Sequence, residues 1–257
     1  MIDLDAFLQG ESESWELTAI IDTALCVGAG GSSGSLADKP IVRNAQGQLL
    51  IPGSQIKGRL RHECEKLARA LGWQVFYAPI ATELCPNHTQ VQPRFQQIYS
   101  VPGYKGYHCI VSQIFGDPIL PSRLIVDDFI CPLSVNELSE VLRPGVTINR
   151  SRRTAEERKL YLLETSPVNV QLEFTGIIHL LKPFTCDNSD YAKPLIYAAL
   201  HRIYALGGSK STGLGWLRWK PLPKLSPDDT AWSGLFAVPP HATNNIEVQS
   251  VVQHEAN

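Results

Sequence analysis

The sequence predicts an α+β domain on the ferredoxin-like or RNA-recognition-motif plan, with insertions. Two segments, 51–71 and 191–206, repeat apolar residues at helical spacing. Other segments have the alternation or composition of strands, at residues 15–27, 41–43, 49–51, 123–132, 168–181 and 214–219. The elements therefore follow the order strand, helix, strands, helix, strand, which is the order of this plan.

We assign the domain to residues 1–220, with insertions at about 72–122 and 143–165. Residues 221–257 have no helical or strand periodicity and many prolines, serines and asparagines. We interpret them as an extended or disordered tail.

The first strand leads into a loop rich in glycine. Its apolar positions are Trp15, Leu17, Ala19 and Ile21. Residues 28–35 then read Gly-Ala-Gly-Gly-Ser-Ser-Gly-Ser. Because glycine lets the backbone approach a ligand closely, this loop is a candidate binding segment. Asp38 follows it, and a turn at 44–47 precedes the first helix.

The helix at 51–71 begins with the turn Pro52-Gly53 and carries a basic surface. Ser54 is the expected N-cap, because its hydroxyl can accept a hydrogen bond from an early helical N–H. The unpaired N–H groups of the helix N-terminus and the cations of this surface together favour an anion. The cations are Lys57, Arg59, Arg61, Lys66 and Arg69. A solvated helix face is the alternative interpretation of such a charge run.

Residues 72–122 lack periodicity and hold a possible zinc site. A C-x2-H spacing places two soft ligands on one turn, and further ligands could come from across a hairpin and from the preceding helix. The candidate ligands are Cys85, His88, His108, Cys109, His62 and Cys64. Buried, unligated thiols are the alternative, since the six cysteines are spread over a chain too long to need disulfides.

Residues 143–159 form a strongly basic segment. The cations are Arg143, Arg150, Arg152, Arg153, Arg158 and Lys159. The segment has few apolar residues to bury, which suits a projecting hairpin or mobile loop whose arginines bind phosphates. A solvated loop without a ligand is the alternative.

A second glycine-rich segment, 207–215, follows the second helix. Its Lys210-Ser211 pair does not make a phosphate-binding P-loop, because Ser209 precedes the lysine and a helix stands where a strand is required. The backbone around Gly208 can still approach a phosphodiester closely, with Lys210 supplying the charge.

Composition and charge limit the partners. The chain has 257 residues, 44% of them hydrophobic, and a formal net charge of −2. A nucleic acid must therefore be recognised by a local basic surface and not by the field of the whole protein. The sequence has no long apolar run, and its first residues are acidic where a signal peptide would be basic. We expect a cytoplasmic protein with no membrane contact.

Five blocks of the sequence, in order, resemble those of the RAMP superfamily of CRISPR systems. IPGSQIKGRLR resembles the "IPGSSLKGxxR" motif, and GGSKSTGLGW resembles the C-terminal glycine-rich loop. CIVSQIFGDP, INRSRRTAEERKLYLLE and VQLEFTGIIHL are similar to the remaining blocks of the backbone subunits of type III (Csm/Cmr-type) effector complexes. The resemblance covers residues 15–219.

The resemblance implies a subunit that binds guide CRISPR RNA and pairs it with complementary target RNA, beside neighbouring backbone subunits and other effector subunits. It implies guide contacts from Ser54, Lys57, Arg59 and Arg61. Residues 148–164 resemble the thumb hairpin, which contains Arg150, Arg152 and Arg153. Asp38 stands where the family has its catalytic aspartate, and cleavage of the target there implies Mg²⁺ or Mn²⁺.

The chain departs from the family at two positions. Ser112 stands where the family often has a further cysteine, so a structural Zn²⁺ would recruit Cys85, His88, Cys109 and His62. Ala155 replaces a usual glycine of the thumb.

Three functions stay open at the level of sequence. The chain is a metal-dependent endoribonuclease subunit with Asp38 catalytic, or the same guide-binding scaffold without catalysis, with Asp38 a turn residue. The third is a guide-processing endoribonuclease that needs no metal and uses His62 or His201. All three require both glycine segments and the basic hairpin to lie together, with Lys57, Arg152 and Lys210 on one side.

Overall fold

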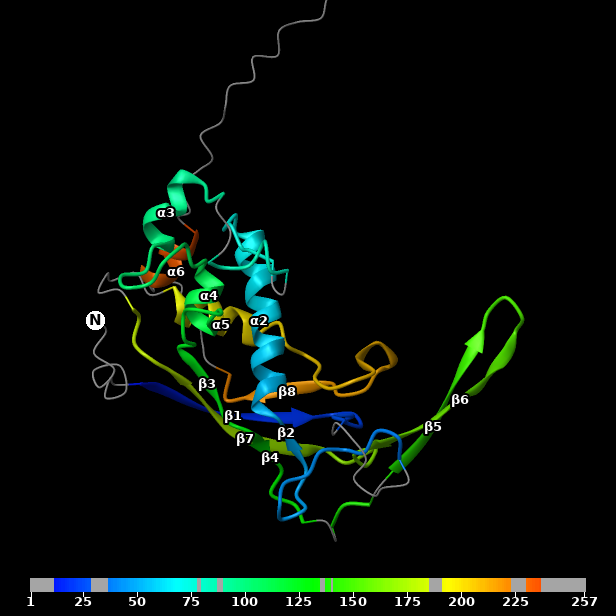
Figure 1. The fold of residues 1–257 in the computed structure, drawn as a ribbon. Coiled ribbons are helices and arrows are strands. Elements are labelled where there is room, and N and C mark those ends of the chain that lie inside the picture. The colour runs from blue at the N-terminus through cyan, green and yellow to red at the C-terminus, as the bar shows by residue number, and fades with distance from the viewer. Residues whose placement is uncertain are drawn as a thin grey trace, which may run out of the picture.

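A computed structural model shows an antiparallel sheet with helices on one face and a long hairpin projecting at one end (Figure 1). The structure describes residues 12–28, 37–77, 80–86, 90–134, 137–139, 141–184, 191–222 and 230–236. Most of the first glycine loop and His88 lie outside the described residues.

The sheet has its first strand near the centre. β1 (Glu13–Ile21) pairs antiparallel with β7 (Leu172–Leu180) on one side and with β8 (Leu217–Lys220) on the other. Beyond β7 come β4 (Phe129–Ile130) and β2 (Leu50–Ile51), and β3 (Leu124–Val126) also pairs with β7. This antiparallel order with helices on one face is compatible with the predicted ferredoxin-like core.

The predicted alternation in β1 is confirmed, but the strand ends at Ile21 and not at the predicted residue 27. Leu17, Ala19 and Ile21 are buried. Residues 22–27 leave the sheet, because their backbone groups bond to other loops, beginning with the Asp22 N–H, which donates to Trp216 O (2.8 Å).

The first predicted helix is α2 (Gly53–Ala70), whose buried side includes Ile56, Leu60 and Cys64. The prediction that Ser54 caps it is wrong. Ser54 is exposed inside the helix, and Asp128 Oδ1 instead accepts a hydrogen bond from the Gly53 N–H (2.7 Å). Gly53 is required there, since a Cβ would lie 2.1 Å from Val126 O.

The strand predicted at 123–132 is two short strands, β3 and β4, interrupted at Asp127 and Asp128. The interruption arises because Asp128 turns to the N-terminus of α2 while Asp127 lies 3.4 Å from His179 Nε2. The prediction that the two carboxylates do not act as a pair is confirmed.

The second helix, α5 (Ala192–Leu200), ends earlier than the predicted residue 206 but buries the predicted apolar side. In the strand before it, Leu172 and Phe174 are buried as predicted, whereas Val170 precedes β7 and is exposed.

Residues 72–122 contribute to the core more than their lack of periodicity indicated. They form α3 (Pro93–Tyr99) and α4 (Ile110–Phe115). Trp73, Phe95 and Tyr99 are buried, and the last two rings stack with centroids 5.2 Å apart. Phe95 and Tyr99 lie one helical turn apart, but α3 has only seven residues, too few for a repeating apolar pattern to be recognised in the sequence.

The prediction of an extended tail is wrong for one segment. Residues Thr230–Phe236 form α6, and the Trp73 indole donates to Leu235 O (3.1 Å). Leu235 is fully buried, and this contact stabilises a helix too short to show periodicity in the sequence.

The basic segment forms a hairpin of β5 (Val141–Asn149) and β6 (Thr154–Thr165). Figure 1 shows that its tip lies far from the helices. Its base, residues 162–166, is hydrogen-bonded to the backbone of Leu25 and Lys39.

Candidate nucleic-acid interface

Four segments distant in sequence meet at the base of the hairpin, and we call this region the junction. It consists of residues 22–28, 37–43, 162–166 and 206–215. The second glycine segment and the base of the basic hairpin are therefore both bonded to the chain that enters and leaves the first glycine loop.

The second glycine segment is held by backbone contacts, and one of them requires glycine. Gly208 N–H donates to Cys26 O (2.6 Å), and Gly215 N–H donates to Ala24 O (2.9 Å). Gly215 has φ of +71°, and a Cβ there would lie 1.9 Å from Leu206 O. The loop therefore presents its middle, the 3-10 turn Lys210–Thr212, to solvent.

The three residues predicted in this loop, Gly208, Lys210 and Ser211, are all exposed. The Lys210 ammonium donates to Gly207 O (2.8 Å) across the turn. This partner is a neutral carbonyl and supplies no counter-charge, so the loop presents a cationic surface.

A buried carboxylate holds the hairpin at the junction. Glu164 Oε2 accepts from the Ile41 N–H (3.1 Å), and Oε1 accepts from the Arg43 guanidinium (3.2 Å). Leu25 N–H donates to Ser166 Oγ (2.8 Å) two residues further along. The base of the hairpin is therefore fixed relative to the residues on either side of the first glycine loop.

Asp38 lies at this junction. It is exposed, and its Oδ2 accepts a hydrogen bond from the Leu162 N–H of β6 (2.7 Å). Among the described residues, its Oδ1 has no hydrogen-bond partner. The hydrogen bond from the Leu162 N–H joins Asp38 to the hairpin. The two residues are 124 positions apart, so the sequence did not indicate the contact.

One further cation, Lys39, lies at the junction, and sequence reasoning missed it as a site residue. Arg143, which the sequence placed in the basic segment, lies opposite Leu163 at the hairpin base. Burial raises the pKa of the Cys26 thiol, and the positive charges of Lys39 and Arg143 act against that rise. The Lys39 ammonium also lies 5.8 Å from the centroid of the Tyr161 ring. Lys39 belongs to no cluster of basic residues in the sequence. Its position at the junction depends on the bridge between Lys39 and Leu163 of the hairpin base.

The hairpin tip carries the three arginines predicted to bind RNA. Arg150, Arg152 and Arg153 are exposed in the turn between the strands. Asn149 Oδ1 organises the turn by accepting from the N–H groups of Ser151 and Arg152 (both 3.1 Å).

The cations of α2 have a different environment. Their partners are glutamates of the same helix, in the pairs Arg59–Glu63 (2.9 Å), Arg61–Glu65 (3.2 Å), Lys66–Glu63 (3.3 Å) and Arg69–Glu65 (3.5 Å). This pairing favours the solvated helix face over an anion-binding surface.

The sequence led us to expect Lys57 beside the glycine segments and the hairpin, but Lys57 does not lie with the junction residues. Its ammonium donates to Ser122 Oγ (2.8 Å) and Leu124 O (2.7 Å) at the start of β3. Burial lowers the pKa of Lys57, which follows from its position between the helix and the sheet edge. The base of the hairpin and the second glycine segment therefore both lie at the junction. The prediction of a common side for Lys57, Arg152 and Lys210 is wrong for Lys57.

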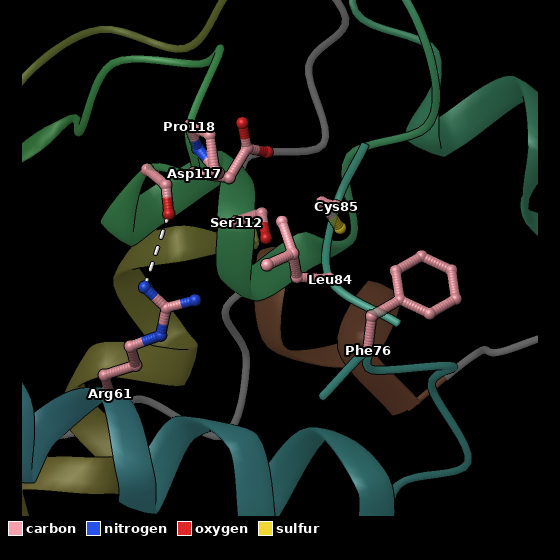
Figure 2. Close-up of a pocket in the computed structure, with 8 residues that line it drawn as sticks. Arg61, Phe76, Leu84, Cys85, Ser112, Asp117 and Pro118 are labelled. Carbon is pink, nitrogen blue, oxygen red and sulfur yellow. Dashed lines mark hydrogen bonds between the residues drawn. The ribbon is translucent and has the colours of Figure 1, made fainter. Parts of the chain in front are cut away.

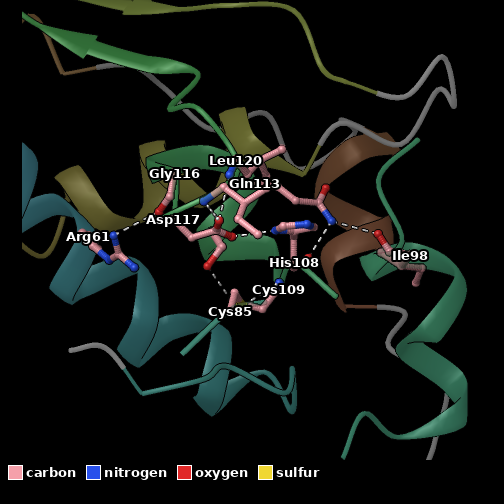
Figure 3. Close-up of polar contacts among 11 residues, drawn as sticks. Arg61, Cys85, Ile98, His108, Cys109, Gln113, Gly116, Asp117 and Leu120 are labelled. Atoms are coloured by element: carbon pink, nitrogen blue, oxygen red, sulfur yellow. Dashed lines mark hydrogen bonds and ion pairs between the residues drawn. The ribbon is translucent and has the colours of Figure 1, made fainter. Parts of the chain in front are cut away.

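The structure brings together two of the four predicted zinc ligands. Cys109 N–H donates to Cys85 Sγ (3.3 Å), as Figure 3 shows. A hydrogen bond between the thiols raises the pKa of Cys85 and lowers that of Cys109. The described residues include no group of three or more ligands that could hold a metal ion, so His62 does not complete the set, and His88 lies outside the described part.

Other candidates near the cysteines have structural partners. His108 Nδ1 lies 2.6 Å from Asp117 Oδ2, and the Cys64 thiol donates to Leu195 O (3.8 Å). Cys85, Ser112 and Asp117 line a small cavity of about 200 Å³, into which Figure 2 shows Arg61 reaching from α2. Arg61 donates to Gly116 O there (3.3 Å), which joins α2 to the segment after α4.

The model of the RAMP superfamily matches residues 18–218 of the chain. The chain belongs to the RAMP superfamily. The match runs from β1 to β8 and includes the junction and the hairpin, and membership indicates a CRISPR-associated RNA-binding subunit. A comparison with curated protein sequences gave no match. Within the part of the chain that the structure describes, no helix combines the length and apolar character needed to cross a bilayer.

Proposed function

We propose that this chain is a guide-RNA-binding backbone subunit of a type III CRISPR effector complex. In this role β5–β6 is the thumb hairpin, which lies against the paired guide and target RNA beside neighbouring backbone and other effector subunits. The observation that carries the proposal is the junction, where the cationic glycine loop and Lys39 meet a hairpin that carries Arg143 near its base and three arginines at its tip. Exposed glycine backbone and cations are what a ribonucleotide backbone requires.

We extend the proposal to cleavage of the target RNA at Asp38. Mg²⁺ is commonly bound by one or two carboxylates completed by substrate phosphates and water, and an exposed aspartate beside a phosphate-binding surface fits that arrangement. When bound, the metal stabilises negative charge on the scissile phosphate. Asp38 would hold this ion through its carboxylate, or accept the proton of the attacking ribose 2′-hydroxyl.

One observation supports the same scaffold without catalysis. The hydrogen bond from the Leu162 N–H gives Asp38 a structural role at the hairpin base, and that role alone would account for an aspartate here (2.7 Å). The two proposals therefore differ only in what Asp38 does for bound RNA.

The test uses the complex assembled with guide RNA and labelled complementary RNA, with Mg²⁺ or with chelator. Asp38→Asn keeps an oxygen that can accept from the Leu162 N–H but removes the charge. We expect this variant to bind both RNAs as the unmodified chain does and to lose cleavage at one or more sites. Asp127→Ala is the matched control, because it removes an exposed carboxylate near His179 and away from Leu162.

The outcomes separate the proposals. Unchanged cleavage by the Asp38→Asn complex would overturn the catalytic role and leave the scaffold. Absence of guide RNA from complexes containing this chain would overturn both.

A further inference from the structure

Two exposed aromatic rings lie at the stem of the second glycine segment. The side chains of Tyr204 and Trp216 are 56% and 47% exposed. Their ring centroids are 5.5 Å apart with an interplanar angle of 35°, so they form one continuous apolar surface. Nothing in the packing of the described core requires two large rings in solvent, which makes them candidates for a ligand contact.

The backbone beneath the rings is rigid. Ala205 and Trp216 form an antiparallel bridge, and Leu217 N–H donates to Tyr204 O (2.9 Å). Thr23 Oγ1 accepts from the Trp216 N–H (3.0 Å) on the side of β1. The rings are therefore held at the mouth of the loop that carries Lys210, and not on a free end of the chain.

Exposed cations lie close to the pair along the chain. The exposed cations near Tyr204 and Trp216 in the sequence, including those of β8, are Arg202, Lys210, Arg218 and Lys220. Arg218 makes a two-point contact with Asp22 (2.9 and 3.0 Å), and Arg202 lies 3.8 Å from Glu63. Lys210 and Lys220, which have no carboxylate partner among the described residues, therefore supply the charge for an anion. Flat rings within a cationic surface, next to exposed glycine backbone, match the way single-stranded nucleic acid is bound.

We infer that Tyr204 and Trp216 form a platform on which one nucleobase of the bound RNA strand stacks. This inference rests on the proposed function and adds a base contact to the backbone contacts of the junction. A docked protein partner would also use aromatic rings, but the surrounding lysines and arginines favour a polyanion. Because every base has a flat face, the platform would be tolerant of sequence.

The experiment measures binding of the full chain to oligouridylate of roughly 12 nucleotides and to a strand with the same phosphates but no bases. Trp216→Ala should weaken binding of oligouridylate by about 5- to 50-fold and leave the abasic strand unaffected. The dependence of that affinity on salt should stay the same, since no cation is removed. Trp216→Phe keeps a ring and should retain most of the affinity.

Two control variants interpret the result. Tyr77→Ala removes an equally exposed aromatic ring, which lies against Arg69 in the last turn of α2. This variant should bind oligouridylate as the unmodified chain does. Arg152→Ala tests the proposed function, because it should weaken both strands and reduce the dependence on salt.

The outcomes distinguish failure of the platform from failure of the proposed function. Equal affinity of Trp216→Ala and the unmodified chain for oligouridylate, with Arg152→Ala impaired, would overturn the platform and leave the proposed function. An equal loss for the abasic strand would also overturn the platform, because stacking cannot explain it. Failure of the unmodified chain to bind either strand would overturn the proposed function and the platform together.

Discussion

Helix α2 and the hairpin β5–β6 are both rich in arginine, but they use the charge differently. In α2 each of four cations lies within 3.5 Å of Glu63 or Glu65, so the helix supplies its own counter-charges. At the hairpin tip the arginines stand in an exposed turn, and the hairpin is fixed at its base by the junction. The difference teaches that a basic sequence predicts an anion site only where the fold leaves the charges unpaired.

The largest expected effect tests whether the junction is as rigid as the comparison requires. Gly215→Ala should lower the free energy of unfolding by about 3 kcal/mol, because its Cβ would meet the backbone of Leu206 at a positive φ. Gly213→Ala is the matched control: its φ is +89°, but its Cβ would have open space, and it should cost about 1 kcal/mol. Urea unfolding measures both, and equal losses would show that the close contact at Gly215 is not important.

The next effect concerns the attachment of the hairpin. Glu164→Ala removes the acceptor of the Ile41 N–H and of Arg43, and we expect a loss of about 2 kcal/mol in unfolding free energy. Hydrogen exchange should accelerate in residues 37–43 more than in α2. Uniform acceleration across the domain would contradict a local role.

A smaller effect concerns α2 itself. Asp128→Ala removes the carboxylate that accepts from the Gly53 N–H and should cost about 1 kcal/mol, as loss of a helix cap does. Asp127→Ala, with a longer contact to His179, should change stability by less than about 0.5 kcal/mol. If the two variants melt together, the helix start depends on something other than this cap.

The sequence predicted the elements that bury a regular apolar pattern. The alternation in β1 and the apolar side of α2 identified both, because burial imposes a period of two or 3.6 residues. The helices containing Phe95 and Leu235 escaped prediction, since each has only seven residues, too few to show a repeating pattern.

The site was predictable in composition but not in contacts. Both glycine segments and the basic hairpin were recognised from residue type, and the Gly208 loop does pack against residues preceding the first segment. The place of Lys57 and the helix cap by Asp128 depend on contacts between residues 65 and 75 positions apart in sequence. No local pattern encodes such contacts.

We expect the hairpin, and not α2, to supply the charges that bind RNA. The most direct test compares two variants that each remove three positive charges: Arg150, Arg152 and Arg153 to Gln, and Arg59, Arg61 and Arg69 to Gln. Both variants change the net charge by the same amount. A difference in RNA affinity between them therefore reports where the removed charges lie.

The measurement is the affinity for single-stranded guide-length RNA over a range of salt concentrations, with circular dichroism to confirm that both variants are folded. We expect the hairpin variant to bind roughly 10- to 100-fold more weakly at moderate salt, with the slope of log affinity against log salt reduced by about 2. The α2 variant should bind within about threefold of the unmodified chain and keep its slope. Equal losses in both variants, or a larger loss in the α2 variant, would contradict the account.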